Sequence, residues 1–179
     1  MEQPQTLEQF FVSVEKRAFR IAEIATRNRE DALDILQDAM YKLVQKYAER
    51  EPQEWGPLFQ TILQSKINDW YRRNAIRNRF RVWFKTDADQ EQGDVIQALE
   101  DTKSENPELE LQSGRSIEEL ERVLTSLSLR QQQTFILRIW EGMSVAQTAK
   151  VMKCSEGSVK THYSRAVHAL RQQLGVHWP

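Results

Sequence analysis

One stretch of the sequence combines basic and aromatic side chains in a way that suits contact with nucleic acid. Between Lys66 and Lys85 the chain carries seven lysines and arginines against a single acid, Asp69, and five aromatic residues lie among them. Basic groups bind the phosphate backbone, and exposed rings stack on unpaired bases. A cluster with so many positive charges and one negative charge is unfavourable unless a bound anion offsets it. The stretch therefore indicates a surface for single-stranded or opened nucleic acid.

The alternative for this stretch is a helix whose rings are buried and whose arginines only extend into solvent. We expect this alternative to hold for Trp70, which continues an apolar stripe with Ile62 and Ile67. We expect it to fail for several of the arginines.

A second stretch, Glu141 to Leu170, has the pattern of a helix-turn-helix. Apolar residues recur at helical spacing in two segments, and each segment is predicted as a short helix with one buried face. These residues are Val145, Ala149, Val151 and Met152, then Val159, Tyr163, Ala166, Val167 and Leu170. The interval Lys153 to Ser155 has room only for a tight turn, and Ser155 is placed to cap the second helix. A helical hairpin with a solvated face is the alternative at this point.

The second helix of this pair presents polar and basic side chains away from its apolar face. The outward positions are Lys160, Thr161, Ser164 and Arg165. Thr161 and Ser164 are short and suit base edges at close approach, whereas Lys160 suits a phosphate. Arg165 has the reach for either a guanine or a phosphate. The face therefore fits the major groove of DNA.

The elements that position these two stretches are predicted to be helices. The chain has only six glycines and five prolines in 179 residues, and its sequence lacks the alternating β-branched runs typical of strands. With 40% hydrophobic residues it can bury one full-sized core or two small ones. We predict an all-α fold of two small helical domains, residues 1–85 and 112–179, joined by an acidic linker at 86–111.

The linker is predicted from its charge. Asp87 to Glu110 contains nine acids and one base, Lys103, with few apolar residues. Such a composition is typical of a flexible tether. The net charge of −1 for the whole chain therefore conceals a basic stretch followed by an acidic one.

Three helices are predicted in the first domain. A capping box at Thr6 begins the first helix, which ends near Asn28. The second runs from Asp31 to about Arg50 and is stopped by Pro52, and the third begins at Trp55.

The second domain is predicted to hold four helices. One starts at Ser116, another runs from about Leu129 to a glycine cap at Gly142, and the last two form the helix-turn-helix, whose first helix is capped by Ser144.

The second predicted helix carries a polar ridge on the side opposite its apolar stripe. The ridge consists of Asp34, Gln37 and Asp38. On its own, such a ridge is an ordinary solvated helix face.

Composition excludes several classes of protein. A single cysteine rules out a disulfide framework and a cysteine-based zinc site. No apolar run approaches the ~18 residues of a membrane span, so no membrane insertion is expected, and acidic Glu2 argues against a signal peptide. The histidines His162, His168 and His177 lack the spacing of a metal or catalytic site. We expect a cytoplasmic protein that is not an enzyme and uses no metal or other cofactor.

Three segments together resemble the extracytoplasmic-function (ECF) group of bacterial RNA polymerase sigma factors, in the sigma-70 family. DALDILQDAMYKL resembles the group's DAEDLVQ-type segment, and WGPLFQTILQSKINDWYRRNAIRNR is similar to its segment that melts and reads the minus-10 promoter element. LTSLSLRQQQTFILRIWEGMSVAQTAKVMKCSEGSVKTHYSRAVHALR is similar to the segment that reads the minus-35 element. The resemblance covers nearly the whole chain, with the segments in the family's order.

The resemblance implies partners and roles for particular residues. Core polymerase would bind the ridge of Asp34, Gln37 and Asp38 through its β′ clamp helices. Promoter DNA is the second implied partner, and an anti-sigma protein is a further one. The implied minus-35 contacts are Lys160, Thr161, Ser164 and Arg165, with Arg138 on phosphate. The implied minus-10 contacts are Ser65, Lys66, Asn68, Tyr71, Arg72, Arg73 and Arg77.

This sequence departs from the group's pattern at a few positions. Leu33 stands where the group usually has Glu, Ser65 where it usually has Asn, and His162 where it usually has Arg. Two other functions remain open from the sequence. One is a helix-turn-helix regulator that is not a polymerase subunit, which would need an α/β receiver upstream. The other is a sigma-like decoy that binds an anti-sigma protein, which would not need the basic stretch.

Overall fold

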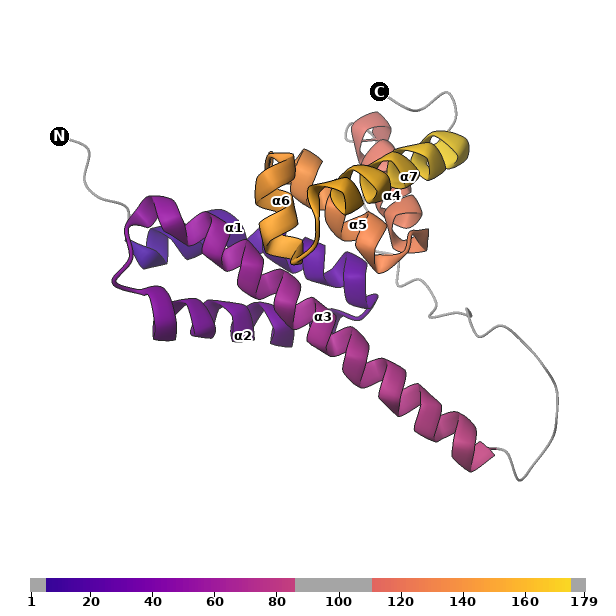
Figure 1. Ribbon diagram of the computed structural model, residues 1–179, viewed down its shortest axis with the longest axis horizontal. Helices are drawn as coiled ribbons and strands as arrows, with labels where there is room; N and C mark the ends of the chain where they lie inside the picture. The colour runs from indigo at the N-terminus through magenta and orange to yellow at the C-terminus, as the bar shows by residue number, and fades with distance from the viewer. Residues whose placement is uncertain (1–5, 86–110, 175–179) are drawn as a thin grey trace.

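The computed structural model describes residues 6–85 and 111–174, with the side chains of residues 6–76 and 118–174. Every regular element in these ranges is helical, which confirms the predicted all-α fold (Figure 1). The elements in order are α1 (Leu7–Thr26), α2 (Arg29–Tyr47), α3 (Pro52–Lys85), α4 (Leu111–Ser126), α5 (Leu129–Phe135), the π-helical turn η1 (Ile136–Trp140), α6 (Val145–Met152) and α7 (Glu156–Leu174).

We call α1 to α3 the N-terminal unit and α4 to α7 the C-terminal unit. The predicted linker at 86–111 lies outside the described residues, except for Leu111, which begins α4. The limits of the two domains therefore stay a prediction.

The first two helices are joined by caps that the sequence carries. The capping box of Thr6 with Gln9 begins α1, as predicted. Arg27 ends the helix in the left-handed region at φ 54°. Asn28 then caps α2 by accepting a hydrogen bond from the backbone amide of Asp31 at 2.9 Å. The prediction that α2 starts at Asp31 was therefore wrong by two residues, because Asp31 lies in the first turn and Asn28 is the cap.

The third helix begins earlier than predicted. Pro52 was expected only to stop α2, but it is the first residue of α3. A proline is favourable there, since the first turn needs no amide donor and the ring fixes φ near the helical value. Trp55 is buried, and its indole Nε1 donates to the carbonyl of Tyr47 at 3.1 Å. This bond ties the end of α2 to the start of α3, whose far end extends past the other helices (Figure 1).

The C-terminal unit contains the predicted helix-turn-helix. Gly142 adopts φ +62° after η1, and Ser144 opens α6 with a capping box. Lys153 ends α6 in the left-handed region, and the hydroxyl oxygen of Ser155 accepts from the backbone amide of Ser158 at 3.1 Å. One helix was predicted from Leu129 to a cap at Gly142. In the structure the second half of this segment is the π-helical turn η1.

One hydrophobic core extends through both units. It joins residues of α1, α2 and α3, such as Ile21, Leu43 and Phe59, to buried residues of the C-terminal unit. The latter are Val123, Leu124, Phe135, Ile136, Ala166, Leu170 and Leu174. A smaller cluster of Leu137, Met143, Val151 and Met152 lies beneath the helix-turn-helix. The two units are therefore packed together in this structure.

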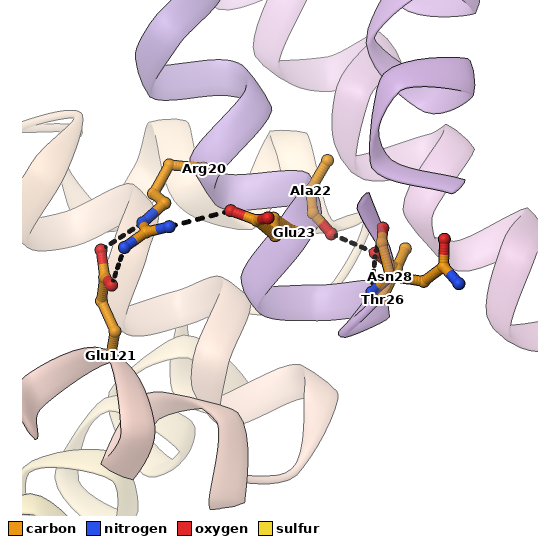
Figure 2. Close-up of polar contacts among 6 residues, drawn as sticks. All are labelled: Arg20, Ala22, Glu23, Thr26, Asn28 and Glu121. Carbon is orange, nitrogen blue, oxygen red and sulfur yellow. Dashed lines mark hydrogen bonds and ion pairs between the residues drawn. The ribbon is translucent and has the colours of Figure 1, made fainter. Parts of the chain in front are cut away.

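The contact between the two units, which we call the seam, has an edge formed by Arg20 of α1 and by Arg27, which follows α1. The guanidinium of Arg20 donates to both carboxylate oxygens of Glu121 on α4 and to Glu23 on α1, the last at 2.9 Å (Figure 2). Arg27 donates to the carbonyl of Thr125. Arg20 of α1 and Arg27, which follows the end of α1, thus bind α4 at two places.

The interior of the seam contains amide side chains. Gln133 of α5 donates from Nε2 to Oε1 of Gln64, at 2.9 Å, and to Oδ1 of Asn68, at 3.2 Å, both on α3. Gln132 donates to the carbonyls of Leu124 and Ile24. The seam is therefore built from directional polar contacts as well as apolar packing.

Glu141 places a carboxylate within this seam. Its side chain is only 14% exposed, and its Oε1 lies 3.9 Å from Nη1 of Arg17 on α1. Burial raises the pKa of the Glu141 carboxyl above its ordinary value of 4.5, while Arg17 and a hydrogen bond from Gln60 of α3 oppose the rise. The charged form of Glu141 is therefore disfavoured by folding.

The variant Glu141→Gln should have a higher free energy of unfolding than the wild type at about pH 7. When folding raises the pKa of a carboxyl group, its protonated form stabilises the folded state. This contribution is complete below the pKa of the unfolded state and is lost as pH rises through the pKa of the folded state. Wild type should therefore lose stability between pH 4.5 and neutrality relative to the variant. Urea unfolding across this range measures the difference, with Glu15→Gln on the exposed side of α1 as the control. Lower stability of Glu141→Gln near neutral pH would contradict the account.

Candidate nucleic-acid interface

The outward face of α7 is set by the residues it buries. Val159, Ala166 and Leu170 are buried against the rest of the unit. The four side chains predicted to face DNA are all exposed, namely Lys160, Thr161, Ser164 and Arg165. The structure therefore brings these four together on one solvent-facing surface, which we call the recognition face.

The recognition face is held by contacts around the turn before it. Arg130 of α5 donates to the carbonyl of Met152 at 3.0 Å, which fixes the end of α6. The Thr161 hydroxyl donates to the carbonyl of Gly157 at 3.0 Å. That hydroxyl keeps its lone pairs, so in this orientation Thr161 offers an acceptor and a methyl group.

The charge of the recognition face comes from Lys160 and Arg165. His162 lies next to them, half-buried, and its pKa is lowered by burial, with Arg130 and Arg165 adding to the shift. The imidazole is therefore neutral at physiological pH.

Arg138, a predicted phosphate contact, lies in η1 and is half-buried. Its Nη1 donates to the carbonyl of Met143 in the turn before α6. A guanidinium has five N–H donors, so this bond leaves others for a phosphate. Arg138 thus stabilises the helix-turn-helix whatever else it contacts.

The predicted minus-10 residues lie on different sides of α3. Arg72 and Arg73 are exposed, with Arg72 3.7 Å from Asp69, and Ser65 is half-buried. Lys66 donates to Oδ2 of Asp38 on α2 at 2.8 Å. The side chain of Arg77 lies outside the described residues.

A groove of about 320 Å³ between α2 and α3 brings two predicted sites together. Its α2 wall carries the ridge of Asp34, Gln37 and Asp38, and its α3 wall carries Lys66 and Arg73. The sequence predicted these as separate polymerase and DNA contacts. Because they share one groove and the Lys66–Asp38 ion pair crosses it, a change at either wall alters the electrostatics of the other.

Trp70 and Tyr71 are held by the N-terminal unit. Trp70 is half-buried and packs against the core, as expected, with its ring centroid 5.2 Å from that of Tyr71. The Tyr71 hydroxyl donates to the carbonyl of Ala25 at the end of α1, at 2.9 Å. Burial raises the pKa of Tyr71, and the phenol stays neutral. Tyr71 is 36% exposed, so part of its ring remains accessible.

Asn68 is separated from the other predicted minus-10 residues, because it faces the seam and accepts from Gln133. Sequence reasoning missed Gln60, Gln64 and Gln133 as members of this polar cluster. Gln60, Gln64 and Asn68 recur every four residues on α3, which places them on one face of the helix. This spacing is the feature of the sequence that could have revealed the cluster.

In the described parts of the chain, no group of three or more histidine, cysteine, aspartate or glutamate side chains is placed to hold a metal ion. Among the same residues, no helix combines the length and apolar character needed to cross a membrane.

The comparisons with known proteins agree with this geometry. Residues 117–170 match the family described as sigma-70, region 4. The RNA polymerase sigma-E factor of Streptomyces avermitilis is 30% identical over 144 residues, which cover 80% of this chain and 71% of that protein. The ECF RNA polymerase sigma factor BldN of Streptomyces coelicolor is 31% identical over 121 residues, which cover 68% of this chain and 41% of BldN.

A solved structure is similar over both units. The sigma factor RpoE of Bartonella quintana, crystallised with the anti-sigma factor NepR, matches with a TM-score of 0.63 at 26% identity, over 94% of this chain and 96% of that one. A helical unit with a basic helix, followed by a helix-turn-helix unit, is thus also the architecture of a solved sigma factor. The chain belongs to the extracytoplasmic-function group of the sigma-70 family.

The variant Tyr71→Phe should lower the free energy of unfolding by about 1 kcal/mol, because the carbonyl of Ala25 loses its partner in a half-buried place. Thermal or urea unfolding measures the change. Tyr41→Phe on α2 is the matched control, since Tyr41 is 68% exposed. Equal stability of both variants and wild type would show that the Tyr71 hydroxyl does not hold α3 to α1.

Proposed function

We propose that this sigma factor binds core RNA polymerase through α2, reads the minus-10 promoter element with α3 and the minus-35 element with α7, and promotes DNA melting. The proposal rests on one observation. The same chain has an exposed recognition face on α7 and a basic helix, α3, that shares a groove with the α2 ridge. Membership of the family supports the same division of labour.

The α2 surface is suited to a protein partner. Beside the ridge, α2 exposes Leu33, Tyr41 and Val44, which are 40%, 68% and 45% exposed. Large apolar side chains that stay in solvent next to polar groups are typical of a protein interface. The β′ clamp helices of core polymerase are the partner that the family resemblance implies.

Charge reversal at the ridge should weaken this binding. Asp34→Lys combined with Gln37→Ala should weaken the affinity for core polymerase by about thirtyfold and reduce its capture in a pull-down, since a truncated polar contact and an opposed charge each cost on the order of 1 kcal/mol. Both side chains are exposed, so the helical circular dichroism should not change. The control is Glu49→Lys, exposed beyond the end of α2. Unchanged capture with intact helicity would exclude the ridge as the docking surface.

The role proposed for α3 rests on its exposed basic groups and on the ring of Tyr71. Arg72 and Arg73 are available to phosphates, and the accessible part of Tyr71 is available to an unpaired base. Base stacking on an aromatic side chain contributes about 1–3 kcal/mol per base. The stacking contact favours the separated strand over the duplex, which is the requirement for melting, and the phosphate contacts hold the DNA in place.

The role proposed for α7 assigns Thr161 and Ser164 to bases and Lys160 and Arg138 to phosphates. Thr161→Ala in the full chain should cost about 1–3 kcal/mol on the preferred duplex and relax preference at one base pair. Lys160→Ala should weaken all duplexes alike and flatten the slope of log affinity against log salt by about one unit. Binding of a duplex library at two salt concentrations separates the two cases. A uniform loss for Thr161→Ala would overturn its assignment.

The proposed partners are core polymerase, promoter DNA and an anti-sigma protein, and the proposed compartment is the cytoplasm. The anti-sigma partner is supported by the similarity to RpoE, whose structure holds NepR.

Transcription tests the whole proposal. The full chain should direct a bacterial core polymerase to start at specific fragments of the source genome, with permanganate-reactive thymines near each start. Core binding without any specific start would contradict promoter recognition.

A further inference from the structure

His162 lies at the border between the buried face of α7 and the recognition face. It is half-buried, and it lies four residues before buried Ala166 and three residues before exposed Arg165. Residues three or four apart are neighbours on the surface of a helix, so the imidazole borders the recognition face on the side of Arg165. Among the described residues, neither ring nitrogen of His162 has a hydrogen-bond partner. Both nitrogens can therefore bind a ligand that approaches this face.

Two arginines lie near His162. Arg130 of α5 and Arg165 of α7 act on the ring through their charge, and both side chains are exposed. Arg130 is held in place by the bond from its Nη1 to the carbonyl of Met152, at 3.0 Å. A guanidinium has five N–H donors, so this bond leaves others for an anion. His162 and the two arginines thus form a group of nitrogen-bearing side chains beside the recognition face.

No carboxylate among the described residues offsets the charge of this group. The helix α5 has no acid, and α6 has Lys150 but no acid. The one acid of α7, Glu156, lies in its first turn, six positions before His162. The acids of α4 do not act on the ring, and the end of α4 meets α7 at Gln173, about three turns beyond it. Burial and the two arginines lower the pKa of His162, so the ring is uncharged at neutral pH in the free protein.

A DNA phosphate at this edge of α7 would favour the opposite form of the ring. A nearby negative charge stabilises a protonated histidine, and both ring nitrogens are then donors. The DNA backbone borders the major groove, so a helix that lies in the groove has phosphates along its flanks. Arg130 and Arg165 attract a phosphate to the flank on which His162 lies. Protonation of the ring and binding of the phosphate are therefore coupled.

We propose that His162 is a further contact of α7 with duplex DNA, and that its ring binds a backbone phosphate in the protonated form only. Binding of the duplex then takes up a proton, and the affinity for DNA rises as pH falls. This inference rests on the proposed function of α7 and adds the dependence of that function on pH. Lysine and arginine contacts stay charged throughout the neutral range, so the histidine supplies this response.

The pH range of the effect is set by the pKa of His162 in the free protein and in the complex. The pKa of the free ring lies below its ordinary value of 6.5, and a bound phosphate raises it. The gain in affinity is therefore complete below the pKa of the free protein and is lost as pH rises through the pKa of the complex. A pKa that is higher by about one in the complex corresponds to a gain of about tenfold.

The affinity of the full chain for a short fluorescent duplex of mixed sequence, at low salt, tests this proposal. Wild type should bind about tenfold more tightly at about pH 5.5 than at about pH 8. His162→Gln should have the lower affinity at both pH values, because glutamine stays neutral. His162→Arg should have the higher affinity at both, because arginine stays charged. The matched control is His168→Gln, at an exposed position further along α7, which should keep the pH dependence of wild type.

Proton uptake is a second and direct readout. Calorimetric titration with the duplex at about pH 6, in two buffers of different ionisation enthalpy, gives the number of protons bound per complex. Wild type should take up more protons than His162→Gln, whereas His168→Gln should match wild type. The slope of log affinity against log salt should also steepen by about one unit at the lower pH in wild type and stay constant in His162→Gln.

Equal pH dependence in wild type and His162→Gln would overturn the proposal, and so would loss of the dependence in His168→Gln instead. Titration of other groups is common to all variants and cancels in this comparison. Duplex binding that depends on Lys160 but not on His162 would overturn the inference and leave the proposed role of α7 standing. Proton uptake through His162, without any base preference that depends on Thr161, would support the inference and contradict promoter reading by α7.

Discussion

The packing of α4 onto α1, and of α5 and α6 onto α3, is the contact on which the rest of the structure depends. It joins two small helical units into one hydrophobic core, and Phe135 and Ile136 supply its centre from the C-terminal side. The Arg20–Glu121 pair closes the edge of this contact, and Gln133 fills its polar interior. A small helical unit buries little surface alone, so sharing a core stabilises both.

The same contact determines which functional surfaces are free. The recognition face on α7 is exposed, and so are Arg72 and Arg73 of α3 and the α2 ridge. Among the described minus-10 candidates, Asn68 is the exception, because it faces the seam and accepts a hydrogen bond from Gln133. The packing of the units thus leaves the recognition face in solvent and turns Asn68 toward the seam.

Most helices could be predicted from local signals. The caps at Thr6, Ser144 and Ser155 and the helical spacing of the apolar residues in α7 gave elements that the structure confirms. The start of α4 at Leu111 could not be predicted, because Gly114 weakens the helical signal of its first turn. The π-helical turn at Ile136–Trp140 was also missed, since one extra residue in a turn leaves the apolar pattern nearly unchanged.

The candidate site was predictable only where it lies within one helix. The orientation of Lys160 and Arg165 follows from the residues that α7 buries. The pairing of Lys66 with Asp38 joins residues 28 positions apart, and that of Gln133 with Gln64 joins residues 69 positions apart. Such contacts depend on how helices pack, which periodicity does not determine.

Site-specific cross-linking on promoter DNA tests the central claim, that both units contact one promoter at different places. A photoreactive amino acid would replace Arg73 on α3 or Lys160 on α7, and each variant would be assembled with core polymerase on a promoter found by transcription. The account predicts that position 160 cross-links to an upstream duplex segment and position 73 to a downstream segment that becomes single-stranded. Cross-links from both positions to the same duplex segment, or from position 160 alone, would contradict it.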